Sequence, residues 1–340
     1  MTALGGSVRR RPLPRLAASE TTAAVAVLAV LALLPVVTSG YLIYILPQYM
    51  LYGVMAMSLA LLWGMGGILS MGQAGFFAIG GYTMGLCFRW IGAVNPGYAA
   101  LLIAPAVGVV LAGALGYFLF RAGVRSAYFV LVTLAISIIV EQVAVSQSQI
   151  TGGWNGMYID RLTVTLGPWV DVPLSGDSPI YYLILAVSAL IYVGLRRLER
   201  SKFGKVLVGI RENEDRAIAL GFDPSLYKTV AFMISGGLAS FAGALYGTHA
   251  GFVAPSLGGV LFSTEVVVWV AIGGRGSFLA ALVAAILVAW LSNYLSTLIP
   301  DYWPLFIGSL FILVIVFFKD GIAGALRRAL ARPGRAGGDA

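Results

Sequence analysis

Long apolar segments follow one another through most of the chain, with only short polar connections between them. A membrane accepts only helices or closed barrels, because backbone groups in lipid must be hydrogen-bonded within the protein. The short alternating patterns typical of barrel strands are absent from the sequence, so we predict an all-α polytopic membrane protein. Since about 20 helical residues cross a bilayer core, we expect about ten transmembrane or partly broken helices. They are 21–39, 41–64, 73–92, 97–120, 126–146, 179–196, 229–249, 262–274, 279–299 and 303–318.

The composition supports this class and excludes others. Hydrophobic residues make up 59% of the chain and charged residues only 11%, whereas about a quarter of the residues in a soluble domain are charged. The single cysteine, Cys87, and the single histidine, His249, exclude a disulfide framework and a Cys or His metal cluster. The net charge of +8 could attract nucleic acid, but the cations lie at the ends of apolar segments. We therefore predict no nucleic-acid partner and no metal site.

The distribution of Lys and Arg predicts the orientation, because cytoplasmic loops carry an excess of them. With the N-terminus in the cytoplasm and alternating spans, only Arg89 and Arg161 of the 22 Lys and Arg residues fall outside. We therefore expect both termini in the cytoplasm. The chain then has a basic N-terminal arm (1–20), a transmembrane domain (21–325) and a basic tail (326–340). The transmembrane domain contains one large cytoplasmic loop (198–228) and one external loop (147–178).

The cytoplasmic loop 198–228 is unusually charged for this chain. After Gly204, the pattern VLVGIRENEDRAIAL is typical of a helix, with Gly221 as a stop and Asp223–Pro224 as a turn. A loop that only fixes the orientation of the protein in the membrane needs a few cations, whereas this segment is long and contains charges of both signs. Two interpretations stay open at this point: a solvated loop that fixes orientation, or a helix that docks on a cytoplasmic partner.

Polar residues also lie inside apolar segments. The glycine-rich stretch 69–82 contains Ser70, Gln73, Gly75 and Tyr82. It indicates either close helix packing or a broken helix along a translocation path. Segment 262–274 is short and ends in glycine, which indicates a partial or tilted span.

Thr133, Ser137 and Glu141 recur every four residues along segment 126–146. The hydroxyls can bond back to their own helix, whereas a carboxylate in a membrane usually faces a bundle interior or a water-filled cavity. We treat this stripe, together with the polar residues of 69–82, as candidate translocation-path residues. A second carboxylate, Glu265, is expected near the outer interface, in contact with water.

The external loop contains the glycine-rich motif TGGWNG at 151–156. Such a motif is typical of an ordinary connection. It also presents Gly152, Gly153, Trp154 and Asn155 as candidate contacts for a protein that delivers solute.

Four motifs resemble one family in the order in which they occur. They are LSMGQAGFFAIGGY (69–82), TGGWNG (151–156), GKVLVGIRENEDRAIALGFDPSLYKTVAFMISGGLASFAGALYG (204–247) and WVAIGGRGSF (269–278). Together they resemble the LivM-type permeases of branched-chain amino acid ABC importers over about residues 50–325. Four ordered matches are far more specific than one short pattern.

The resemblance implies that the cytoplasmic loop is a coupling helix in a groove of an ATPase subunit. DRAIALG (215–221) resembles a degraded form of the coupling motif of ABC permeases, from which Arg216 departs. The implied ATPase contacts are Arg211, Glu212, Asn213, Glu214, Asp215, Arg216, Ala217 and Gly221.

The partners follow from the same resemblance. No G-x-x-x-x-G-K-[ST] phosphate loop occurs, so we predict no cofactor in this chain, with ATP and magnesium on separate subunits. The resemblance implies two ATPase subunits, a second homologous permease subunit and a periplasmic or extracellular solute-binding protein. The chain is then a transport subunit of the bacterial cytoplasmic (inner) membrane and not an enzyme.

The substrate is less narrowly defined. The family implies branched-chain or hydrophobic amino acids, which we place first. The stretches GFDPSLYKT and EVVVWVAIGGRG resemble its urea branch, so urea or a short amide is the alternative. An autonomous secondary transporter or channel is a third hypothesis, which would need ionisable groups near the membrane midplane.

Overall fold

The computed structural model describes residues 14–38, 40–91, 96–124, 126–161, 164–165, 171–172 and 176–300, and residues 302, 305, 308, 309 and 312. In this part of the chain, seven helices are long and apolar enough to cross a membrane, which confirms the predicted all-α polytopic class. They are α1 (Pro14–Val37), α2 (Tyr41–Ala60, continued by the π-helix η1, Leu61–Gly66), α4 (Pro96–Arg121), α5 (Ser126–Ser146), α7 (Asp177–Arg200), α10 (Pro224–Ala250) and α12 (Phe278–Leu298).

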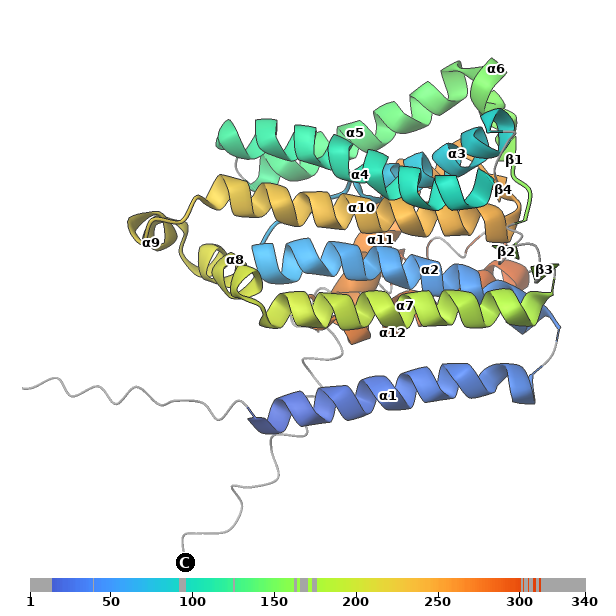
Figure 1. Cartoon of the computed structure of the whole chain (residues 1–340), viewed down its shortest axis with the longest axis horizontal. Helices are drawn as coiled ribbons and strands as arrows, with labels where there is room; N and C mark the ends of the chain where they lie inside the picture. The colour runs from blue at the N-terminus through green and yellow to red at the C-terminus, as the bar shows by residue number, and fades with distance from the viewer. Residues whose placement is uncertain are drawn as a thin grey trace, which may run out of the picture.

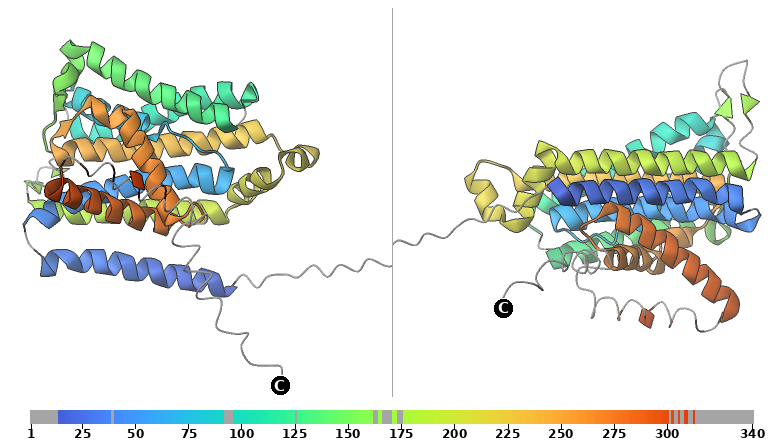
Figure 2. Two further views of the ribbon diagram at one scale, coloured as in Figure 1. Left: turned by 180° about the vertical axis from the view of Figure 1, so that it is seen from behind. Right: turned by 90° about the horizontal axis from the view of Figure 1, so that it is seen from below.

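The helix α2 runs through the middle of the bundle, where it packs against α7, α10, α11 and α12 (Figure 1). Most of its residues are buried. The helix α12 crosses it at an angle (Figure 2). On the outside, α1 is held against α7 by a hydrogen bond from the Tyr181 hydroxyl to the Leu31 carbonyl (2.6 Å) and by an ion pair between Arg196 and Glu20.

Glycines allow α3 (Gln73–Trp90) and α10 to approach each other closely. A Cβ atom on Gly243 would lie 1.8 Å from the Phe77 carbonyl oxygen, and one on Gly80 would lie 1.8 Å from the Ser240 carbonyl oxygen. Only glycine fits at this distance. Gly80 therefore has the close-packing role that was predicted for the glycine-rich stretch 69–82.

Two apolar helices, α3 and α11 (Val260–Gly273), begin inside the bundle after non-helical backbone. The segment before α11 contains β4 (Phe252–Val253) and the 3₁₀ turn η4 (Pro255–Gly258), which packs against α3 and α5. Irregular backbone at this depth requires protein on all sides, because lipid offers no hydrogen bonds. The prediction of a partial span is confirmed for α11, which has 14 residues. The helix α3 is continuous from Gln73 to Trp90, so the segment 73–92 is not broken.

The connections gather at the two ends of the bundle (Figure 1). At one end lie the short helices α8 (Lys202–Glu212) and α9 (Glu214–Ala219). At the other end lie α6 (Ser148–Thr151), the 3₁₀ turn η2 (Gly153–Asn155) and two small antiparallel ladders. In the ladders, β1 (Met157–Tyr158) pairs with β4, and β2 (Val164–Thr165) pairs with β3 (Asp171–Val172). The cytoplasmic assignment of the α8–α9 end stays a prediction.

Three sequence predictions fall wholly or largely outside the described residues. They concern the basic arm up to residue 13, the last expected span at 303–318 and the basic tail at 326–340.

The close contact between α3 and α10 generates a stability prediction. We expect Gly243→Ala to force the two helices apart, at a cost of about 1–3 kcal/mol typical of overpacking. The measurement is the thermal unfolding midpoint in detergent, which should fall. The control is Gly194→Ala on α7, where a Cβ atom meets nothing within 4 Å. Equal midpoints for the two variants would contradict the packing account.

Candidate functional site

Side-chain caps give the segment 198–228 a defined shape. The Ser201 hydroxyl accepts a hydrogen bond from the Gly204 amide at the start of α8 (3.2 Å). Asn213 Oδ1 accepts one from the Arg216 amide at the start of α9 (2.8 Å), and Asp223 caps α10. Such caps satisfy helix N–H groups that have no partner within the helix. The predicted loop is therefore a pair of short ordered helices that ends at Gly221, whose φ of 86° favours glycine.

One face of α8 packs against the bundle through Leu207 and Ile210, which are buried. At its end, the Arg211 guanidinium donates a hydrogen bond to the Gly64 carbonyl in the last turn of η1. The last carbonyls of a helix lack intrahelical donors, so this bond satisfies one of them. A Cβ atom on Gly67 would lie 2.6 Å from Arg211 Cγ, and one on Gly64 would lie 2.0 Å from the Arg275 carbonyl oxygen. The Arg211 side chain therefore contacts the end of η1, which continues α2. The backbone that leads into α3 and the turn between α11 and α12 meet at the same place.

The opposite face of α8 and α9 is open. Most of the predicted ATPase-contact residues are exposed, whereas Ala217 is buried. Glu214 forms an ion pair with Lys228 (2.7 Å), which ties α9 to α10. The exposed members are Arg211, Glu212, Asn213, Glu214, Asp215, Arg216 and Gly221.

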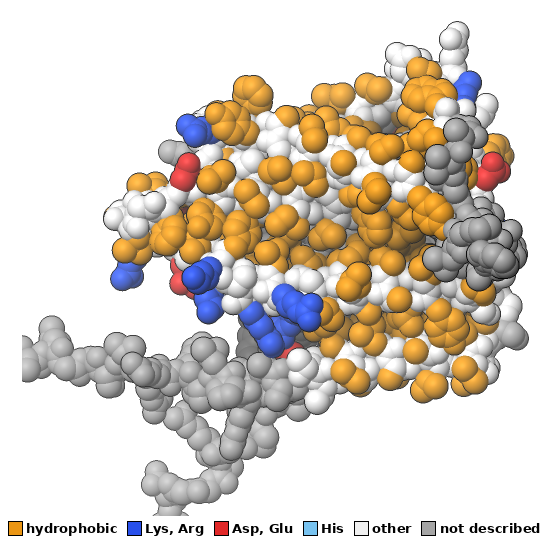
Figure 3. All heavy atoms as spheres, in the orientation of Figure 1, with side chains coloured by type: hydrophobic (Ala, Val, Ile, Leu, Met, Phe, Trp, Pro, Cys, Tyr) orange, Lys and Arg blue, Asp and Glu red, His pale blue; other side chains and the backbone are white. Residues whose placement is uncertain are grey.

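Exposed apolar side chains accompany these charges. Ile218, Leu220 and Phe222 are 55%, 70% and 38% exposed, and a cavity of about 710 Å³ separates α9 from Phe120 and Val124. Figure 3 shows hydrophobic side chains near the Lys and Arg side chains that gather at this end. Sequence reasoning selected the charged residues and missed the apolar ones. The sequence does contain a signal for these apolar residues, because they are hydrophobic residues in a segment that is otherwise polar.

Gln73, in the glycine-rich stretch 69–82, forms a buried hydrogen-bond network that joins α3 to α2 and α10. Gln73 Nε2 donates to the Ser235 hydroxyl of α10 (3.0 Å), and Gln73 Oε1 accepts from the Ser58 hydroxyl of α2 (3.1 Å). The Ser235 hydroxyl in turn donates to the Ser58 carbonyl (2.6 Å). The amide of Gln73 is therefore satisfied within the protein, as a membrane interior requires.

The stripe on α5 supports the start of α3. The Thr133 hydroxyl accepts from the Met71 amide (3.1 Å), and the Ser137 hydroxyl accepts from the Gly75 amide (2.9 Å). In the non-helical backbone just before α3, the Ser70 hydroxyl accepts a hydrogen bond from the Gly72 amide (3.1 Å). The structure thus brings these candidates together, with their hydrogen bonds directed to the backbone.

Tyr82 and Glu141 differ from the rest of the set. The Tyr82 hydroxyl is buried without a hydrogen-bond partner in the described chain. Glu141 is partly exposed, and its carboxylate lies beside Gly259 at the start of α11. These two keep polar groups available for a solute, unlike the residues whose groups are bonded to backbone.

The loop 151–156 forms a tight turn at the opposite end of the bundle. Gly152, Gly153 and Gly156 have positive φ, and the Thr151 hydroxyl donates to the Gln147 carbonyl (2.8 Å). Trp154 is 76% exposed, and Asn155 is exposed as well. The motif is therefore an ordered turn that presents an exposed indole ring.

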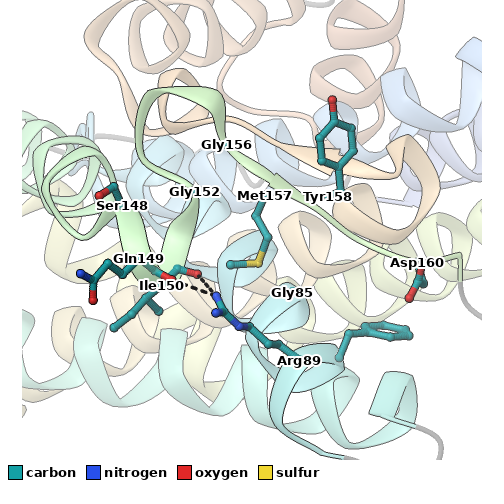
Figure 4. A pocket seen from close by; sticks show the side chains of 11 residues that line it. Gly85, Arg89, Ser148, Gln149, Ile150, Gly152, Gly156, Met157, Tyr158 and Asp160 are labelled. Atoms are coloured by element: carbon teal, nitrogen blue, oxygen red, sulfur yellow. Dashed lines mark hydrogen bonds between the residues drawn. The ribbon is translucent and has the colours of Figure 1, made fainter.

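A cavity of about 340 Å³ lies next to this turn (Figure 4). The Arg89 guanidinium donates to the Gln149 and Ile150 carbonyls at its edge (3.0 and 3.2 Å), and Asp160 and Tyr158 also line it. Arg89 therefore ties α3 to the short helix α6 and holds the turn in place.

A further cavity, of about 300 Å³, lies between α2, α11 and α12. Glu265 lines it together with Tyr52 and Val288, which lie near the middle of α2–η1 and of α12. The same cavity also reaches Ile45 and Ser296, near the ends of α2 and α12, and Glu265 is partly exposed. The expected position of Glu265 near the outer interface stays a prediction.

The network around Gln73 generates a prediction. In Gln73→Leu, the Ser235 hydroxyl loses its buried donor partner and the Ser58 hydroxyl loses an acceptor. Both hydroxyls keep a backbone acceptor, the Met55 and Ser58 carbonyls, so the loss is that of two hydrogen bonds. At about 0.5–1.5 kcal/mol for each bond, we expect the unfolding free energy to fall by about 1–3 kcal/mol. Thermal melting in detergent measures it, with Thr83→Val as the control, because the Thr83 hydroxyl bonds only to its own helix. A melting point for Gln73→Leu equal to that of Thr83→Val would disprove the structural role.

Comparison with known proteins places this bundle in a family. A family model described as "Branched-chain amino acid transport system / permease component" matches residues 41–315. The high-affinity branched-chain amino acid transport system permease protein LivM of Salmonella typhimurium is 30% identical, over 85% of this chain and 72% of that protein. LivM of Escherichia coli K12 is 30% identical, over 83% and 69%.

A second group of relatives carries a different name. The autoinducer 2 import system permease protein LsrC of Enterobacter sp. 638 is 29% identical, over 92% of this chain and 89% of that protein. No solved structure matches significantly. The relatives are permease proteins, in agreement with the prediction of a transport subunit.

The family match covers every long helix of the described bundle except α1, and it includes α3, α8, α9 and α11. The predicted multi-pass protein of the bacterial cytoplasmic membrane agrees with this match and with the seven long apolar helices. The chain belongs to the family of permease components of branched-chain amino acid transport systems.

Proposed function

We propose that this chain is the permease subunit of an ABC importer that moves branched-chain or other hydrophobic amino acids. A solute-binding protein delivers the amino acid, and ATP-driven alternating access carries it across the membrane. The observation that carries the proposal is the α8–α9 pair, which is capped, ordered and open on one face. The substrate rests on the LivM relatives at 30% identity.

The exposed apolar side chains of α9 support the docking step. Ile218, Leu220 and Phe222 lie among exposed charges at an end of the bundle that the distribution of Lys and Arg assigns to the cytoplasm. Neighbouring apolar side chains exposed to water indicate a protein contact. We propose that this face binds one ATPase subunit. A homologous permease subunit and a second ATPase subunit complete the transporter.

The contacts of α8 suggest how movement of the ATPase reaches the membrane part. Arg211 joins α8 to the last turn of η1, and η1 lies against the Arg275 turn between α11 and α12. A short rigid helix can pass a displacement to packed helices as a rigid body. In this mechanism, closure of the ATPase pair displaces α9 and α8. The displacement then reaches α2 and the two helices that begin inside the bundle.

The opposite end is the place where the solute-binding protein would dock. The turn 151–156 presents Trp154, and the cavity beside it contains Arg89 and Asp160, so aromatic and charged groups lie side by side. Aromatic residues and arginine are enriched in protein interfaces. We propose that Gly152, Trp154 and Asn155, which are exposed, contact the loaded binding protein, whereas Gly153 is buried and shapes the turn.

The docking claim is tested by Leu220→Arg. This side chain is 70% exposed, so the substitution should not disturb the fold. It places a charge in the proposed contact, and we expect ATPase co-purification and ATP-driven leucine uptake in proteoliposomes to fall about tenfold or more. The control is Lys202→Gln, an exposed position at the start of α8.

The outcomes separate the parts of the proposal. Normal co-purification and uptake in Leu220→Arg would show that the ATPase docks elsewhere. Uptake of urea but not of leucine by the wild type would overturn the substrate while leaving the docking surface intact. Uptake without any ATPase subunit would overturn the ABC mechanism.

A further inference from the structure

The cavity between α2, α11 and α12 is a built polar site inside the bundle. Its volume of about 300 Å³ lies at the lower end of the range of about 300–1,000 Å³ for small-molecule sites. It reaches from the middle of α2, at Tyr52, to the polar stretch of α12 at Ser292 and Asn293. Neither the translocation candidates of α3 and α5 nor the coupling segment contributes to its lining.

Glu265 gives this cavity its charge. Among the described residues, its carboxylate has no hydrogen-bond or ion-pair partner, and no Lys or Arg lines the cavity. A carboxylate inside a membrane protein is costly and usually pairs with a positive group or marks a solute path. The cavity therefore favours a cationic group and disfavours an anion.

The lining favours an organic cation over a bare metal ion. The Tyr52 and Trp269 rings stack at 5.4 Å, and both line the cavity beside Glu265 as an apolar wall. Tyr52 also stacks on Tyr246 (5.7 Å) and Trp269 is 2% exposed, so the wall is rigid and packed from behind. A hard metal ion such as calcium would need six or more oxygen ligands, whereas one carboxylate lines this cavity.

Hydrogen-bond donors lie on the other side of the cavity. Gln48 and Ser292 line it, and neither has a hydrogen-bond partner among the described residues. Asn293 Nδ2 is fixed by the Tyr41 and Tyr49 hydroxyls (3.0 and 2.7 Å). Free amide and hydroxyl donors are suited to a carboxylate that arrives together with an ammonium group.

We propose that this cavity binds a zwitterionic amino acid within the permease. Glu265 accepts hydrogen bonds from the ammonium group, and Gln48 and Ser292 donate to the carboxylate. Tyr52 and Trp269 form the apolar wall beside Glu265. Ile45, Val268 and Val288, which also line the cavity, surround a small apolar side chain. The assignment rests on the proposed import of hydrophobic amino acids, and it adds a selecting site inside the membrane to the one on the binding protein.

The test is equilibrium binding of radiolabelled L-leucine to the purified transporter complex in detergent, without the solute-binding protein. We expect Glu265→Gln to weaken binding about tenfold or more, because a charge-assisted hydrogen bond is lost. Glu265→Asp keeps the charge and should retain part of the affinity. Thr264→Val is the matched control on the same helix, since the Thr264 hydroxyl is bonded to the Val260 carbonyl (2.9 Å).

Competition on the wild-type complex gives an answer independent of any variant. Isopentylamine, which has the ammonium group without the carboxylate, should displace leucine. The acid 4-methylpentanoate, which lacks the ammonium group, should compete far more weakly. Stronger displacement by the acid, or by urea, would overturn the ammonium assignment.

The two proposals fail in different ways. If Glu265→Gln binds and imports leucine like the wild type, this cavity is not the ammonium site and amino acid import still stands. If the wild-type complex, supplied with ATP and its binding protein, imports no amino acid, the proposed function itself fails.

Discussion

Within a membrane, every backbone N–H and C=O must find a partner inside the protein, and much of this structure follows from that constraint. The two helices that begin inside the bundle leave backbone groups without helical partners. Thr133 and Ser137 of α5 accept hydrogen bonds from the amides at the start of α3. The Gly64 carbonyl at the end of η1 accepts one from Arg211. Side-chain polar groups therefore supply partners at the places where regular helix begins or ends.

The same constraint connects the fold to the proposed mechanism. At the end of η1 the Gly64 carbonyl lacks an intrahelical donor, and Arg211 of α8 supplies one. A hydrogen bond with a charged donor is worth about 1.5–3 kcal/mol, so this bond joins α8 to η1 in the proposed mechanism. Close glycine contacts place the starts of α3 and α11 against α5. The helix α11 also packs along α2, so a displacement of α2 bears directly on α11.

The sequence predicted the helical class, the short span at 262–274 and the helical structure within 198–228, because length, glycine content and capping residues are local signals. It did not predict the partners of Gln73, since Ser235 lies 162 residues away and no local pattern connects them. The cavity beside Glu265 joins α2, α11 and α12, so no local pattern could predict it. The exposure of Ile218, Leu220 and Phe222 and the hydrogen bond from Arg211 to the Gly64 carbonyl also needed the tertiary structure.

Transmission through Arg211 is the central claim, and the ratio of ATP hydrolysed to solute imported in proteoliposomes tests it most directly. Arg211→Gln removes the charged donor to the Gly64 carbonyl, and Arg211→Lys keeps a cation. The account predicts that Arg211→Gln retains ATPase binding and hydrolysis while uptake falls about tenfold, with Arg211→Lys in between. An unchanged ratio in Arg211→Gln would contradict the account.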